Sequence, residues 1–151
     1  MRYAFPAASA AILAAHGWQA GRNIAPQAAI LAWEQDGYTV FPAGVHFIQS
    51  FHGIALSHRS WNGDADDESC FDAIQATRGF DRLWALEVYQ PLIGQKLLPV
   101  GQGYARHLSY LIAEDGAVYA GYDGFFCRIG ADVVAALENI IFNRDFLILQ
   151  H

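Results

Sequence analysis

Residues 98–122 read LPVGQGYARHLSYLIAEDGAVYAGY and shape their surroundings more than any other stretch of the chain. Two runs rich in β-branched and aromatic residues meet at Asp115-Gly116, which predicts a β-hairpin. The Asp-Gly pair suits a two-residue type I′ turn, because both central positions of that turn need positive φ. We therefore expect a central Asp-Gly hairpin that the rest of the chain covers.

The composition predicts one ordered domain over residues 1–151. A chain of 151 residues buries roughly 70% of its unfolded surface on folding, enough for a core of its own. Apolar residues make up 54% of the chain and charged residues 16%, the opposite of a disordered composition. Four Trp, seven Tyr and ten Phe indicate an aromatic-rich core, with an aromatic patch at a partner surface as the alternative.

The net charge of −6 argues against nucleic acid as a partner. Affinity for nucleic acid comes mainly from Lys and Arg that meet phosphates, and the chain has only nine of them. An acidic surface instead suits a basic protein partner, although acidity also serves solubility alone.

The two cysteines and the N-terminus predict a cytoplasmic protein. Cys70 and Cys127 form no CxxC pair and no zinc-like spacing, so we expect reduced thiols. Pro6 interrupts the alanine-rich N-terminal run, which therefore does not match a signal peptide. No stretch approaches the roughly 20 apolar residues that span a bilayer, so we expect no membrane partner.

Periodicity and turn signals predict an α+β fold in which about five helices cover a mixed, mostly antiparallel sheet. Proline, glycine and asparagine signals place the helices at residues 6–16, 26–36, 42–52, 80–89 and 132–143. Strands are expected at residues 54–61, 69–72 and 97–100, in the hairpin, and at 125–129. The apolar tail at 146–149 should dock as an edge strand or pack under the last helix.

The acidic run at residues 62–68 is predicted to be a solvated loop. It contains Asp64, Asp66, Asp67 and Glu68. Its spacing differs from that of a calcium-binding loop, which has Gly at its sixth position and Glu at its twelfth, so we expect no calcium site.

Catalytic and metal-binding patterns are weak in this sequence. His46, His52 and His58 recur every six residues, which does not place them on one helix face, so no metal or cofactor site is predicted. The sharpest enzyme hypothesis is a Cys127 nucleophile activated by His107 across the hairpin. Cys127 lies in an apolar run, the setting of an inert buried thiol, so we predict no catalysis.

Five short motifs occur in order along the chain. They are Gly17-Trp18-x-x-Gly21-Arg22 after the first helix, Phe41-Pro42 before a helix ending in Phe51-His52-Gly53, Phe71-Asp72 before a helix bearing Trp84, Leu98-Pro99-Val100-Gly101, and Asp115-Gly116-x-Val118-Tyr119. This order resembles the third subgroup of the SUKH superfamily of bacterial immunity proteins, from about His16 to Asn143. Two turn positions depart from the family pattern, at His52-Gly53 and Asp72-Ala73.

The resemblance implies a single SUKH-like immunity domain, a cytosolic α+β protein that binds and neutralises a toxin domain delivered between competing bacteria. It implies no catalysis. The toxin differs among superfamily members and is often a nuclease or a nucleic-acid deaminase. Relatives also bind protein partners that are not toxins, so a regulatory or scaffold module is the alternative.

The family motifs are interpreted as structural. Trp18 between Gly17 and Gly21 is expected to fill the core, and Arg22 to cap a helix or pair with a carboxylate, with a binding surface as the alternative. Backbone roles are expected for the turn and bulge residues Pro99, Gly101, Asp115 and Gly116.

Contacts with a toxin are expected from exposed carboxylates and aromatic side chains. Aromatic anchors surrounded by acidic groups suit a tight interface with a basic protein. The candidates are Trp61, Asp64, Asp66, Asp67, Glu68, Tyr110, Tyr119, Tyr122 and Asp123, and core packing or solvation is the alternative role for each.

Overall fold

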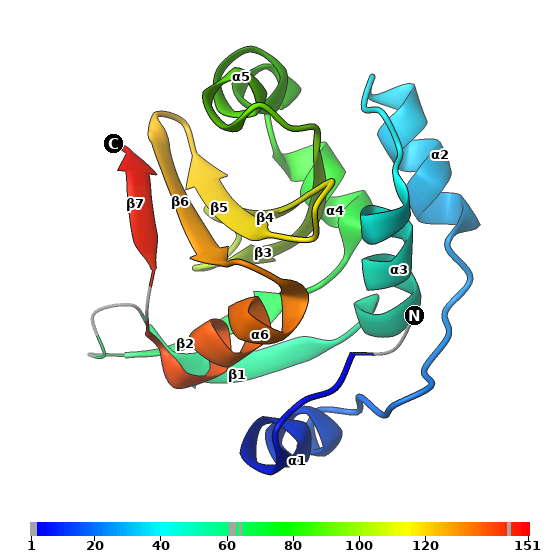
Figure 1. The fold of residues 1–151 in the computed structure, drawn as a ribbon, viewed down its shortest axis with the longest axis vertical. Helices are drawn as coiled ribbons and strands as arrows, with labels where there is room; N and C mark the ends of the chain where they lie inside the picture. The colour runs from blue at the N-terminus through cyan, green and yellow to red at the C-terminus, as the bar shows by residue number, and fades with distance from the viewer. Residues whose placement is uncertain (1–2, 61–62, 64, 145) are drawn as a thin grey trace.

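A seven-stranded antiparallel sheet organises the fold, and its strand order follows the chain order (Figure 1). The computed structural model describes residues 3–60, 63, 65–144 and 146–151. The α+β prediction is confirmed, but every described strand pair is antiparallel, so the sheet is not mixed. The strands are β1 (Ala55–Arg59), β2 (Asp66–Cys70), β3 (Leu97–Gly103), β4 (Leu108–Ala113), β5 (Val118–Tyr122), β6 (Phe125–Gly130) and β7 (Leu147–Gln150).

Six α-helices and one π-helical segment lie around the sheet in the described part of the chain (Figure 1). They are α1 (Ala7–Ala15), α2 (Gln27–Gln35), α3 (Pro42–Phe51), α4 (Ala73–Gly79), η1 (Trp84–Tyr89), α5 (Gln90–Ile93) and α6 (Val133–Phe142). The predictions for α1, α2, α3 and α6 are confirmed. Gly17 and Gly37 follow the first two helices at φ +95° and +86°, left-handed conformations that glycine adopts without strain.

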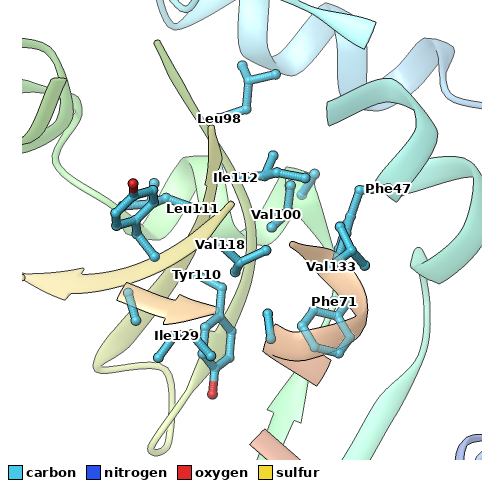
Figure 2. Packing of buried hydrophobic residues seen from close by; sticks show 14 of the residues in the cluster. Phe47, Phe71, Leu98, Val100, Tyr110, Leu111, Ile112, Val118, Ile129 and Val133 are labelled. Carbon is cyan, nitrogen blue, oxygen red and sulfur yellow. The ribbon is translucent and has the colours of Figure 1, made fainter. Parts of the chain in front are cut away.

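One face of the central strands lies under α3 and α6. Leu98, Ile112 and Val118 are cross-strand neighbours on this face. Phe47 of α3 and Val133 of α6 converge with them in the core (Figure 2). The helix α6 also contacts β1, so it lies between the β1–β2 ribbon and the rest of the sheet.

The opposite face lies under α4 and η1. A Cβ atom on Gly79 of α4 would lie 2.7 Å from Gln102 of β3. On the same face, a Cβ on Gly121 would lie 2.7 Å from the ring of Tyr89 in η1. Glycine at these two positions therefore lets the helices approach the sheet closely.

Residues 98–122 form most of three strands, β3, β4 and β5, and not one hairpin. Tyr104, Ala105 and Arg106 have positive φ and turn the chain between β3 and β4. A hairpin at Asp115-Gly116 does join β4 and β5, but only Gly116 has positive φ, at +91°. The type I′ prediction is wrong because Ala113 and Ala117 still pair by a 2.8 Å hydrogen bond, which leaves a three-residue loop.

The Asp-Gly pair at residues 123–124 makes a tighter turn than Asp115-Gly116. Asp123 and Gly124 alone separate the paired residues Tyr122 and Phe125, and Asp123 has φ +45°. The hydroxyl of Tyr89 donates to the Phe125 carbonyl at 3.1 Å, which ties η1 to this turn.

Two helical details differ from the prediction for residues 73–94. The helix α4 was not predicted; Asp72 caps it by accepting from the backbone N–H groups of Ile74 and Gln75 at 3.0 and 3.1 Å. The predicted helix at 80–89 is a π-helical segment at 84–89 that continues into α5, and Gly94 ends it in a left-handed conformation.

The core is rich in aromatic rings, as one of the two interpretations of the composition proposed. Phe51 lies 4.9 Å from Phe47 and stacks on Trp18 at 5.6 Å between ring centroids. Phe71 lies 5.9 Å from Tyr110, and both rings appear with their aliphatic neighbours in Figure 2. The Trp33 indole N–H donates to the Pro99 carbonyl at 2.8 Å, which satisfies its polar atom inside the core.

Two further predictions concern the C-terminal tail and the acidic run at residues 62–68. The tail does dock as an edge strand, β7, and the side chains of Leu147, Ile148 and Leu149 remain exposed. The acidic run is not a loop throughout, since Asp66 to Glu68 belong to β2, where they pair with β1. Cross-strand pairing with Arg59 and His58 favours a strand despite the low β-propensity of aspartate.

Candidate functional site

The acidic part of β2 faces basic residues of β1. Asp66 is directly opposite Arg59, and their side chains form an ion pair at 3.0 Å. Arg59 also donates to the Gly63 carbonyl, which ties the ribbon end together. Both side chains of the ion pair are more than half exposed, so the pair adds little stability and leaves the carboxylate accessible to a partner.

A chain of hydrogen bonds fixes the buried side of the same ribbon. His58 Nδ1 donates to the Arg59 carbonyl at 2.7 Å, because that oxygen only accepts. In the neutral ring, Nε2 then accepts from the Ser69 hydroxyl at 2.7 Å. Ser69 Oγ in turn lies 2.7 Å from the hydroxyl of Tyr110. The acidic side chains of β2 are therefore held on a rigid ribbon.

Two of the aromatic candidates are buried. Tyr110 is 2% exposed and Tyr119 is 6% exposed, so the expectation that they lie at an accessible hairpin edge is wrong. Tyr110 points toward Phe71 and Ser69, and burial raises its pKa. Tyr119 stacks on Phe126 at 5.2 Å. The alternation of β4 and β5 turns both rings into covered faces of the sheet.

Tyr122 and Asp123 are exposed. Tyr122 is 48% exposed and stacks on Phe125 at 5.1 Å, which holds the ring in place at the end of β5. Asp123 follows it in the β5–β6 turn. The hydroxyl of Tyr89 also donates to the Asp123 carbonyl, so the turn is anchored from η1.

The register brings the accessible candidates to one end of the sheet. β2 meets β3 only at Cys70 and Gln102, near the end of β3, so the acidic residues extend past that end. Ser109 pairs with Gly121, which places the β5–β6 turn at the same end of the strands, with β3 and β4 between this turn and β2. We call this region the strand-end surface; it consists of the exposed residues Asp66, Glu68, Tyr122 and Asp123 and of the half-buried Asp67, whose Oδ2 atom is covered.

A groove of about 860 Å³ runs along the acidic part of the strand-end surface. Its walls come from β1, β2, the β3–β4 turn and α6, including Arg106 and Ile141. Trp61 and Asp64, the other two candidates, lie outside the described residues.

The Gly-Trp-x-x-Gly-Arg motif at residues 17–22 has a different environment from the strand-end surface. Trp18 is buried and its indole N–H donates to Ser50 Oγ at 3.0 Å. Arg22 Nη1 donates to the Ser50 carbonyl at 3.0 Å and so caps the last turn of α3. The sequence predicts structural roles for Trp18 and Arg22. It does not predict the cleft of about 260 Å³ that these residues also line.

The hypothetical nucleophile is not activated. Cys127 lies in β6 with its side chain fully buried, and burial raises its pKa to about 12. His107 is exposed in the β3–β4 turn. The thiol of Cys127 is therefore protonated at neutral pH, and a thiol is a poor nucleophile compared with a thiolate.

The three histidines lie apart in the fold, with His46 in α3, His52 after its end and His58 in β1. Within the described ranges, no group of three or more His, Cys, Asp or Glu side chains could hold a metal ion. The described helices also include none with the length and apolar character needed to cross a bilayer.

Comparison with known proteins identifies the family. The SUKH-3 immunity protein family matches residues 5–143, which include every helix and all strands but β7. Searches of curated proteins and of solved structures found no match. Members of an immunity family neutralise a toxin and do not catalyse a reaction, in agreement with the buried, protonated Cys127. The chain belongs to the SUKH-3 immunity protein family.

Proposed function

We propose that this immunity protein neutralises its cognate toxin by direct binding through the strand-end surface. One observation carries the proposal: the exposed carboxylates of Asp66, Glu68 and Asp123 lie at the same end of the strands as the exposed ring of Tyr122. An interface of ordinary size has about 20–30 residues on each side, and a partner would need one of that size to contact both the start of β2 and the β5–β6 turn.

The charge of the surface favours a basic toxin. The whole chain has a net charge of −6, and the ribbon end carries three consecutive acidic residues. Carboxylates steer a basic partner toward the surface and suppress encounters with acidic proteins. A nuclease or a nucleic-acid deaminase has such a basic surface, because it must bind phosphates.

Binding alone is enough for neutralisation. A protein that covers the basic surface of a nuclease or deaminase removes the site at which nucleic acid binds. No chemical step by the immunity protein is needed, and the chain acts in the cytoplasm, where the toxin would meet its target. Tyr122 would supply the aromatic anchor and the carboxylates the surrounding polar contacts.

Co-expression with the toxin domain encoded beside this gene tests the proposal. The chain should restore growth, and purification of the toxin should recover a complex of fixed stoichiometry. A variant carrying Cys127→Ser and His107→Ala should protect equally well. Growth arrest that persists despite a well-expressed immunity protein would contradict neutralisation, and recovery of the chain with a housekeeping protein instead would favour the regulatory or scaffold role.

A further inference from the structure

A second cleft opens beside the C-terminal half of α3, away from the strand-end surface. It has a volume of about 260 Å³ and we call it the Arg22 cleft. A hydrogen bond of 2.8 Å from the Ile24 N–H to the Gln49 carbonyl holds the loop against α3 and keeps the cleft walls together. The lining residues are Tyr3, Trp18, Ala20, Gly21, Arg22, Asn23, His46, Gln49 and Ser50.

The charge of the Arg22 cleft is opposite to that of the chain. Among the residues that the structure describes, its lining contains no Asp or Glu, although acidic residues outnumber Lys and Arg by 15 to 9 in the sequence. Neither of the ion pairs found among the described residues includes Arg22. Partial burial lowers the pKa of Arg22, because desolvation disfavours its charged form.

The guanidinium group of Arg22 is held in place but keeps free donors. Nη1 donates to the Ser50 carbonyl at 3.0 Å, which fixes the plane of the group. A guanidinium has five N–H donors, so most of them remain available. Asn23, Gln49 and His46 add further polar groups around the same space.

We propose that the Arg22 cleft binds a single carboxylate of a partner protein, such as the side chain of an exposed glutamate. The planar fork of arginine matches the two oxygens of a carboxylate, and one permanent positive charge balances one negative charge. The fork also matches a phosphate, but a phosphate dianion beside one arginine would keep a net negative charge. The cleft is distinct from the strand-end surface, so the proposal does not depend on which surface the toxin binds.

Titration of the isotope-labelled protein with N-acetyl-glutamate amide tests the proposal. This probe carries one carboxylate on a neutral backbone, and N-acetyl-glutamine amide is its uncharged counterpart. The indole N–H signal of Trp18 should shift saturably with the glutamate probe and stay in place with the glutamine probe. The indole of Trp33, buried against Pro99, is the internal control and should not move.

Two variants separate binding from folding. Arg22→Lys keeps the positive charge but loses the planar fork, so the affinity for the probe should fall by about tenfold. Gln49→Glu leaves Arg22 and its bond to Ser50 intact but places a carboxylate in the cleft, and it should abolish binding. An equal response to the glutamine probe, retained binding in the folded Gln49→Glu protein, or tighter binding of inorganic phosphate would each overturn the proposal.

Discussion

The strand-end surface and the Arg22 cleft differ in what their residues do for the fold. Asp66, Glu68 and Tyr122 are exposed and do not belong to the buried core. Trp18 and Arg22, by contrast, fill the core and cap α3 while they line a cleft. A surface made of exposed side chains can change its specificity without loss of stability, whereas a cleft built from structural residues cannot.

The two regions also lie at opposite ends of β1. Gly53, two residues before the strand, lies beside Arg22, and a Cβ there would lie 3.5 Å from the guanidinium. Arg59, at the other end of the strand, pairs with Asp66. Five residues of strand span roughly 17 Å, so one partner of ordinary size that covers one region leaves the other partly accessible.

The largest expected effect is the loss of toxin binding on charge reversal at the strand-end surface. Asp66→Lys combined with Glu68→Lys should weaken binding by about 100-fold, because like charges would face a basic partner. Isothermal titration calorimetry with the purified toxin domain measures the change. The matched control, Glu34→Lys with Glu87→Lys, makes the same change of net charge at exposed positions of α2 and η1. Equal losses in both variants would mean that net charge, not this surface, controls binding.

A smaller effect is expected from the aromatic anchor. Tyr122→Ala should weaken toxin binding by about 30-fold, the size expected for a central aromatic contact of about 2 kcal/mol. The thermal unfolding temperature should stay nearly unchanged because the ring is half exposed. Leu31→Ala, which truncates an exposed apolar side chain on α2, should leave the affinity as it is. A Tyr122 variant that binds like the wild type would move the interface away from the β5–β6 turn.

Binding at the two surfaces should also differ in its dependence on salt concentration. Raising the ionic strength from about 0.05 to 0.5 M should weaken toxin binding several-fold, because exposed carboxylates are screened. The Asp66→Lys and Glu68→Lys variant should lose this dependence. Carboxylate binding in the Arg22 cleft should fall less, because its guanidinium is partly buried. A salt dependence that is the same in the wild type and the variant would place the electrostatic contacts elsewhere.

The smallest effect near neutral pH is on the stability of the fold, through two buried or partly buried groups, Cys127 and Tyr3. Burial raises the pKa of Cys127 from 9.0 to about 12 and that of Tyr3 from 10.0 to about 12. Groups with a raised pKa in the folded state stabilise it below their unfolded pKa, and the stabilisation is lost as the pH rises toward 12. The urea midpoint should therefore be flat from pH 7 to 8 and fall from pH 9 to 11.

Cys127→Ala isolates one of these groups. The variant should be less stable than the wild type at pH 7, because it loses buried side-chain volume, yet its midpoint should fall less steeply above pH 9. Equilibrium urea unfolding followed by tryptophan fluorescence gives both quantities. A midpoint that stays constant up to pH 11 in the wild type would contradict the raised pKa values.

Local signals predicted the helices well, because their ends depend on neighbouring residues. Gly17 and Gly37 end α1 and α2, and Asn143 ends α6 at φ +55°, as expected. The same local logic would have found α4, since Asp72 is a good N-cap, but the short helix lacks a long apolar repeat. The π-helical geometry of η1 left no comparable signal in the sequence.

The turns show where local reasoning fails. Asp115-Gly116 and Asp123-Gly124 are the same dipeptide, yet only the second pair alone separates two paired residues. The difference arises because strand pairing sets the length of each loop. The last pair before the first turn is Ala113 with Ala117, which leaves three residues in that loop. The candidate residues follow the same pattern: the acidic residues and Tyr122 are proposed from residue type alone, whereas the burial of Tyr110 depends on its facing Phe71 and Ser69.

The sequence by itself determined the α+β class, most helix boundaries, the family and the absence of a catalytic motif, because these depend on residue types and short-range spacing. Only the tertiary structure decided that Asp66 to Glu68 form a strand, which tyrosines reach the surface, and that an acid-free cleft surrounds Arg22. These features arise from contacts between residues far apart in the chain. β2 pairs with β1, Tyr110 forms a hydrogen bond with Ser69, and Arg22 donates to the Ser50 carbonyl. Contacts between distant residues decide which side chains are buried, and they leave no short-range pattern in the sequence from which burial could be predicted.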